Sequence, residues 1–301
     1  MRLLRRLVCA AIVCAAVEQL DLFGDRTVLL EAARRAADEG KSDEVRTRGA
    51  ELIARYPDDP AVRRDVSALE DAVSPFERAA GLPASERAEA LLAALRSAPP
   101  SGAVRAALLR AVANAVRAAR GDAGLVDGLP GGHFLLLAGD LDRAETSLRN
   151  AVAEQPTARL TAFLADVLSA RADHAAAHPL FLRALLDDPH DVRFDALLDA
   201  EIARLPTVAE LEIEIEEDPT AWAAPVALVT GVLPIQEALF EATTVSRSND
   251  RLSAPRAFVE AMKRAHSPDD DGIAARRAMK RLCPPLFAAY LERRAHQRRG
   301  G

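Results

Sequence analysis

Two histidines four positions apart have the spacing in this chain that best suits metal chemistry. His174 and His178 would lie on one face of a helix, where two imidazoles can share a metal ion. The zinc-protease form of this pattern needs Glu directly after the first His, and Ala175 stands there. We therefore interpret the pair as partly exposed residues beside a hairpin turn and predict no metal site.

The dipeptide His190-Asp191 offers a second possible centre. It resembles the motif of the HD-type metal phosphohydrolases, which are helical and use scattered His and Asp ligands, and His133, His174 and His178 could supply the other ligands. The dipeptide falls in an expected turn between helices. A metal-dependent hydrolase of this type is one alternative function, and we assign no catalytic residue.

Two further stretches have the residue types of ligand loops but not their patterns. The carboxylates of residues 267–272 suit calcium, but an EF-hand loop with Gly272 sixth needs Glu at position 278, where Ala stands. The glycine-rich stretch of residues 121–132 lacks G-K-[ST] and follows no predicted strand, which excludes a P-loop. We predict no cofactor.

Composition favours a helical protein. Apolar residues make up 50% of the 301 residues and aromatic residues 4%, and the apolar part is mostly Ala, Leu and Val. Residues 251–301 hold twelve Arg or Lys against five Asp or Glu, a net charge of +7, so the total of −6 leaves −13 for the first 250. Overall acidity and scarce aromatics argue against single-stranded nucleic-acid binding, and we predict no nucleic-acid partner. Cys9, Cys14 and Cys283 form no disulfide framework or zinc pattern and are expected to be buried apolar residues.

Residues that commonly begin or end helices divide most of the chain into predicted helices. Asp25 is a candidate cap for a helix that ends before Gly40, and Ser42 or Asp43 for one that ends near residues 56–57. We expect helices near 61–73 and 84–97, with Pro75 interrupting between them, and a long helix over about 102–120.

A short pattern occurs twice with a period of 33 residues. The first copy comprises Gly139, Ala144, Leu148, Ala151 and Pro156, and the second Ala177, Phe181, Ala184 and Pro189. A fixed period of this size is typical of stacked helical units rather than of one enzyme pocket.

These copies resemble the second half of a tetratricopeptide repeat (TPR). That family has Gly at the hairpin turn, small Ala residues where helices nest, a large apolar residue between them and a closing Pro. The copies are degenerate, because the family period is 34, Ala172 replaces the turn Gly, and the first-helix residues are poorly kept apart from Gly132. Weaker copies comprise Gly40, Val45, Gly49, Leu52 and Pro57, and then Pro83, Ala88, Leu92, Leu95 and Pro100.

The resemblance implies an α-solenoid of antiparallel helical hairpins whose first helices line a concave groove. Carrying over the groove-facing positions gives the predicted partner-binding residues Arg34, His133, Arg159, Asp166 and Ser169. It also implies a non-catalytic adaptor that holds a segment of another protein.

The C-terminal third resembles no family. Residues 207–217 are predicted as helix, with an edge strand as the alternative. Asp218 is then a cap with Pro219 at the first helical position, and helices are expected near 254–265, 272–282 and 285–297, with Asp271 as the cap of the second.

The N-terminus allows two interpretations. Arg2, Arg5 and Arg6 precede an apolar run over residues 7–17, the outline of an export signal ending near residue 16, yet the same residues fit one face of a helix. We predict a cytoplasmic protein, with an exported envelope assembly factor as the alternative. No run approaches the length of a membrane span.

The sequence thus predicts an all-α fold in three parts. Residues 1–24 form an N-terminal helix or signal segment, residues 25–206 a TPR-like repeat region with its best repeats over 125–190, and residues 207–301 a C-terminal helical cap or subdomain. The predicted function is a non-catalytic scaffold that binds another protein or peptide; the sequence gives no oligomeric state.

Overall fold

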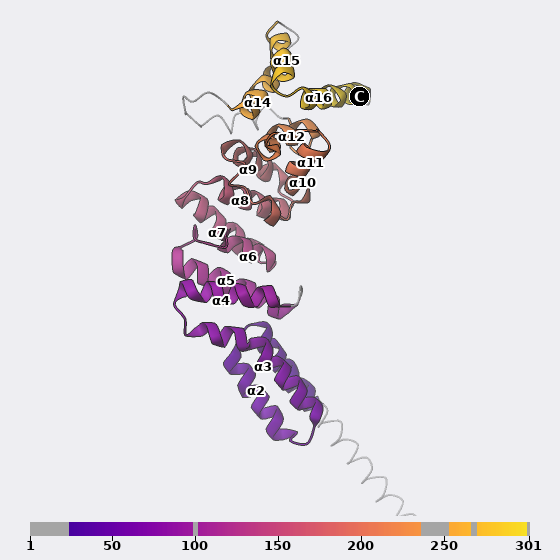
Figure 1. Ribbon diagram of the computed structural model, residues 1–301. Coiled ribbons are helices and arrows are strands. Elements are labelled where there is room, and N and C mark those ends of the chain that lie inside the picture. Colours follow the sequence, from indigo (N-terminus) through magenta and orange to yellow (C-terminus); the bar gives the residue numbers. More distant parts are fainter. Residues whose placement is uncertain (1–23, 99–101, 236–252, 266–269, 300–301) are drawn as a thin grey trace, which may run out of the picture. The chain divides into compact units, whose positions relative to one another are not determined.

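A computed structural model of the chain describes residues 24–98, 102–235, 253–265 and 270–299. These residues are predominantly helical with almost no strand, which confirms the all-α prediction (Figure 1). Within these ranges, strands are limited to the two-residue pair β1 (Leu125–Val126) and β2 (Leu129–Pro130). The predicted signal at residues 1–16 lies outside the described residues.

The chain divides into two compact units. The described residues up to 121, together with 125–129 and 137–139, form the first unit. Residues 122–124 and 130–136 and the described residues from 140 onward form the second. This division does not test the predicted end of the repeat region at residue 206, which stays a prediction.

The first unit consists of consecutive packed helices. A helix over residues 24–38 is followed by α2 (Ser42–Arg55), α3 (Pro60–Ala80), α4 (Ala84–Ser97) and α5 (Ala103–Arg120). Helix α3 packs against α2 and α4, and α4 packs against α5. Two clusters of buried apolar residues hold the first three helices together, one around Leu52 and Val66 and one around Val45 and Val73.

Three predicted helix boundaries in this unit are wrong. Asp25 lies inside the helix over 24–38 and forms an ion pair with Arg55 rather than a cap. Ser42 is the first residue of α2, and no side chain caps that helix. Helix α3 continues through Pro75, although the ring nitrogen cannot donate a hydrogen bond. Burial of Val73, with Phe76 packed against the same cluster, offsets that loss.

The second unit contains the two best copies of the repeat pattern, except for Gly139, which belongs to the first unit. Helices α6 (Gly131–Leu137), α7 (Leu141–Glu154), α8 (Ala158–Ala170) and α9 (His174–Asp187) follow one another with short connections. Helix α8 packs against both α7 and α9. The apolar repeat residues are all buried: Ala144, Leu148, Ala151, Ala177, Phe181 and Ala184. Pro156 and Pro189 stand two residues beyond the ends of α7 and α9.

The rest of this unit, where the structure describes it, is also helical, with several short helices followed by longer ones at the C-terminal end. They are the 3-10 helix η1 (Phe194–Ala196), α10 (Ala200–Ala203), α11 (Leu205–Leu211), the 3-10 helix η2 (Pro219–Trp222), α12 (Ala223–Thr230), α14 (Ala254–Arg264), α15 (Asp270–Leu282) and α16 (Pro284–Arg299). The three predicted C-terminal helices are confirmed, although Asp271 lies inside α15 instead of capping it. Within the described ranges, no helix combines the length and apolar character that crossing a bilayer requires.

The prediction for residues 207–217 is only half right. Helix α11 ends at Leu211, and the following residues form neither helix nor strand. Glu214 adopts a left-handed conformation with φ of 59°, which breaks the helix, and the buried Ile215 turns back so that its N–H donates to the Ala209 carbonyl at 2.9 Å. The predicted cap at Asp218 is confirmed, since its carboxylate accepts the Ala221 N–H.

Candidate partner-binding face

One face of α8 carries three of the five predicted partner-binding residues. Arg159, Asp166 and Ser169 follow at helical spacing, with Phe163 between the first two. His133, on α6, lies against this face, because its ring centroid is 4.8 Å from that of Phe163. The structure therefore brings together four of the five residues.

Arg34, the fifth predicted residue, belongs to the first unit. It lies on the helix over residues 24–38, is exposed, and forms a local ion pair with Glu31 at 2.7 Å. An exposed pair of this kind contributes little to stability.

Asp166 is the most deeply buried charged residue of the α8 face. Its carboxylate accepts the backbone N–H of Leu198 at 2.9 Å and that of Asp199 at 2.8 Å. Burial raises the pKa of this carboxyl group, and the two N–H donors oppose the shift. A carboxylate so placed satisfies donors that would otherwise have no partner.

Arg159 and Ser169 bind the two ends of the segment formed by residues 191–199. The Arg159 backbone N–H donates to the Asp191 carboxylate at 3.0 Å, and its guanidinium pairs with that carboxylate at 2.7 Å. Ser169 donates its hydroxyl to Asp199 Oδ2 at 2.6 Å. Asp199 in turn caps α10 by accepting the Ile202 N–H at 3.1 Å.

Residues 191–199 therefore cover the α8 face, and we call them the covering segment. Val192 and Leu197 point inward and are buried. The covering segment follows its α8 partners by 30–33 residues along the chain, which is the interval at which a following repeat would place its first helix. Apart from η1, however, the segment has no regular secondary structure. In this conformation His133 and Asp166 are buried and not accessible to a partner, while the groove assignment as a whole stays a prediction.

His133 is buried without a complete set of hydrogen bonds. Its Nδ1 has no hydrogen-bond partner within the described part of the chain. Burial lowers the pKa of His133 to about 4, with the nearby Arg193 guanidinium acting in the same direction. Arg193 itself forms a two-bonded pair with Asp195, with both N–O distances at 2.9 Å. His133 is therefore a neutral packing residue near pH 7.

The outer side of the covering segment is accessible. Leu198 is 50% exposed, although its neighbour Leu197 is buried. The Leu198 N–H donates to the Asp166 carboxylate, so the backbone that carries this exposed side chain is anchored to α8. The covering segment thus presents an apolar side chain where α8 was expected to present polar ones.

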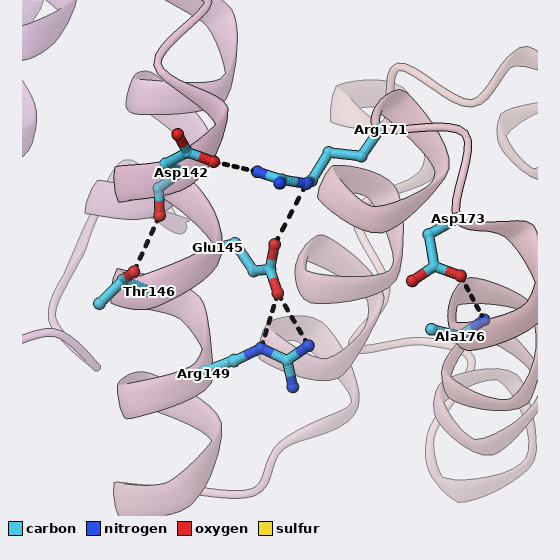
Figure 2. Close-up of polar contacts among 7 residues, drawn as sticks. All are labelled: Asp142, Glu145, Thr146, Arg149, Arg171, Asp173 and Ala176. Carbon is cyan, nitrogen blue, oxygen red and sulfur yellow. Dashed lines mark hydrogen bonds and ion pairs between the residues drawn. The ribbon is translucent and has the colours of Figure 1, made fainter.

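A second polar network joins α7 to the end of α8 (Figure 2). Arg171, just after α8, pairs with Asp142 and with Glu145, the latter at 3.3 Å. Glu145 also accepts from Arg149 at 2.8 Å. Asp173 caps α9 by accepting the Ala176 N–H. Sequence analysis did not identify this network, because charged residues at these positions are equally compatible with a solvated helix face.

The histidines singled out for metal chemistry have other contacts. The rings of His174 and His178 stack with centroids 5.7 Å apart, and α9 continues through Pro179. His190 pairs with Asp218 at 3.1 Å, whereas Asp191 faces Arg159, so the dipeptide has two separate sets of neighbours. In the part of the chain that the structure describes, no three His, Cys, Asp or Glu residues are grouped to hold a metal ion.

Comparison of the chain with protein-family models, with curated proteins and with solved structures found no significant match. The interpretation of the α8 face therefore depends on the contacts described above.

Proposed function

We propose that this chain is a non-catalytic scaffold built from degenerate TPR-like helical hairpins, and that it binds a segment of another protein. The main support is the regular interval of its polar contacts. Arg171 meets Asp142 across 29 residues, Arg159 meets Asp191 across 32, and Asp166 meets Asp199 across 33. In a stack of similar modules, each residue contacts the module about one period away, so a recurring interval is the expected signature.

The close approach between helices supports the same proposal. A Cβ atom added at Gly132 on α6 would overlap Leu148 Cγ and lie 3.0 Å from Leu148 Cδ1 on α7. In the first unit, a Cβ at Gly49 on α2 would lie 2.7 Å from Val66 Cγ1 on α3. Small residues at these two positions let neighbouring helices nest, as hairpin repeats require.

The partner contact that we propose lies on the outer side of the covering segment rather than on α8. Its central residue is Leu198, because this side chain is apolar, half exposed and carried by a backbone that Asp166 and Asp199 hold in place. A surface that is already ordered before binding loses little conformational entropy when a partner arrives. The partner chemistry that fits is an apolar side chain on an extended or helical segment.

The test compares Leu198→Asp with Leu211→Asp, a matched change at a 70% exposed leucine on α11. Proteins near each variant would be identified in cells by proximity labelling, with thermal unfolding of the purified variants as a check of the fold. We expect Leu198→Asp to lose at least one labelled protein that the wild type and Leu211→Asp retain. Identical labelled sets for all three proteins would contradict the proposed contact.

A further inference from the structure

The C-terminal helices of the second unit carry many arginines, and several of those that the structure describes donate to backbone carbonyls at helix ends. Arg293 donates to the Leu228 and Val229 carbonyls at the end of α12, both at 2.9 Å. Arg276 donates to the Ala265 carbonyl after α14, and Arg256 to the Leu186 carbonyl of α9. These cations complete helix ends and are not available to a partner.

Helix α15 carries three cations that have no such role. Arg277, Lys280 and Arg281 are exposed and, at spacings of three and four residues, lie side by side on the helix surface. The opposite side of α15 is buried through Gly272, Ala275 and Met279. Among the described residues, no carboxylate forms an ion pair with any of the three cations. We call these three residues the basic face.

The same unit contains a cluster of the opposite charge. Between α11 and η2, Glu214, Glu216 and Glu217 are exposed and likewise form no ion pair within the described part of the chain. The flanking carboxylates are engaged, Glu212 with Arg204 at 3.6 Å and Asp218 with His190 at 3.1 Å. We call Glu214, Glu216 and Glu217 the acidic segment.

We propose that the basic face of one copy binds the acidic segment of a second copy. Each cluster offers three exposed charges for which the described residues supply no ion-pair partner, and the two sets are equal in number and opposite in sign. A two-fold arrangement would form the contact twice, with each copy contributing both clusters. The inference does not depend on the scaffold proposal or on Leu198.

The surrounding charge favours a protein occupant over an anionic polymer or membrane. Residues 140–235 contain eighteen Asp or Glu and seven Arg, a net charge of −11, and residues 251–301 carry +7, so the two stretches together remain acidic at −4. A net negative charge repels nucleic acid and anionic lipid at long range, whereas a second copy presents both signs in matched clusters. Because all six groups are exposed, the contact is weak and transient, and salt screens it over a Debye length of about 10 Å at 0.1 M.

Sedimentation velocity over a range of protein concentrations tests the proposal at low and at high salt. We expect the mean mass of the full chain to rise from 32.3 kDa toward twice that value at low salt, and to return to the monomer value at high salt. The variants R277E/K280E/R281E and E214K/E216K/E217K should each remain monomeric. Their equimolar mixture should associate again, because the reversed clusters are complementary to each other.

A matched control reverses three exposed arginines of the first unit, R35E/R64E/R78E, with the same change in net charge. This variant should associate as the wild type does. A wild type that stays monomeric at low salt, or a mixture of the two reversed variants that fails to associate, would overturn the proposal. Binding of the wild type to phosphatidylserine vesicles, lost in R277E/K280E/R281E without any self-association, would assign the basic face to a membrane instead.

Discussion

Gly139 and Ala172 stand 33 residues apart, in the turns that precede α7 and α9, and both adopt the left-handed backbone conformation. The φ angle is 76° at Gly139 and 61° at Ala172. Glycine adopts this region without steric conflict, whereas the Cβ of alanine meets the following carbonyl there. The second turn therefore repeats the shape of the first with a residue that is unsuited to it.

Exchanging these residues should move stability in opposite directions. Ala172→Gly should raise the free energy of unfolding, and Gly139→Ala should lower it, each by about 1 kcal/mol. No atom lies within 4 Å of a Cβ added at Gly139, so the cost there is conformational rather than steric. Urea unfolding measures both changes, and a destabilising Ala172→Gly would contradict the assigned turn.

Gly132→Ala should destabilise the fold by about 1–3 kcal/mol, because the new methyl group overlaps Leu148. Gly81→Ala is the control, since φ there is −82° and no atom lies within 4 Å of the added Cβ. Unfolding by urea should show a loss for the first variant alone. The combination of Gly132→Ala with Leu148→Ala should cost less than the sum of the single changes; strict additivity would argue against the contact.

Asp166→Ala should destabilise the protein by about 2–4 kcal/mol, because it leaves two N–H groups without their acceptor. The effect should be local as well as global. Amide hydrogen exchange should accelerate at Leu198 and Asp199, and less at residues of the first unit. Unchanged exchange at both amides would show that the covering segment is held by other contacts.

His133 should make the fold sensitive to acid. The pKa of a free imidazole is 6.5 and burial lowers that of His133 to about 4, so between these values the unfolded chain binds the proton and the folded chain does not. The stabilising contribution of the neutral ring is therefore complete above pH 6.5 and declines as the pH falls toward 4, by about 3 kcal/mol at most.

A comparison with His133→Phe isolates this group, because all other titrations are shared by both proteins. Arg193 and Asp195, which face the ring, keep their mutual pair in the variant. The wild type should lose more stability than His133→Phe between pH 6.5 and 4. Parallel pH profiles for the two proteins would mean that His133 titrates normally in the folded state.

The sequence could predict the parts of this fold that depend on local periodicity. The spacing of Ala144, Leu148 and Ala151 identified a buried helix face, and all three are buried. Proline was a weaker guide, since Pro75 lies inside a helix whose flanking residues are packed. The local pattern also led to a wrong prediction at Glu214, where helix was expected. The spacing of apolar residues does not indicate that a residue adopts the left-handed backbone conformation.

The sequence predicted which residues share one face of α8, but not that another segment covers that face. Helical spacing placed Arg159, Asp166 and Ser169 together, yet what covers them lies about one period further along the chain. The period itself was the available signal, because residues 191–203 stand 33 positions after α8. The missing regular helix there, replaced by η1 and loop, removed the pattern that would have revealed the packing.

The central claim is that successive hairpins of the second unit are copies of one another set side by side. Distances between pairs of spin labels test it directly, with one pair at Asp142 and Ala175 and the other at Asn150 and Arg183, all exposed and each pair 33 residues apart. The account predicts equal mean distances for these two pairs and a longer distance for a third pair at Asp142 and Arg183, because α7 and α9 then run parallel and this pair is offset by eight helical residues, about 12 Å along the axis. A distance between Asp142 and Arg183 shorter than the other two, as antiparallel helices would give, would contradict it.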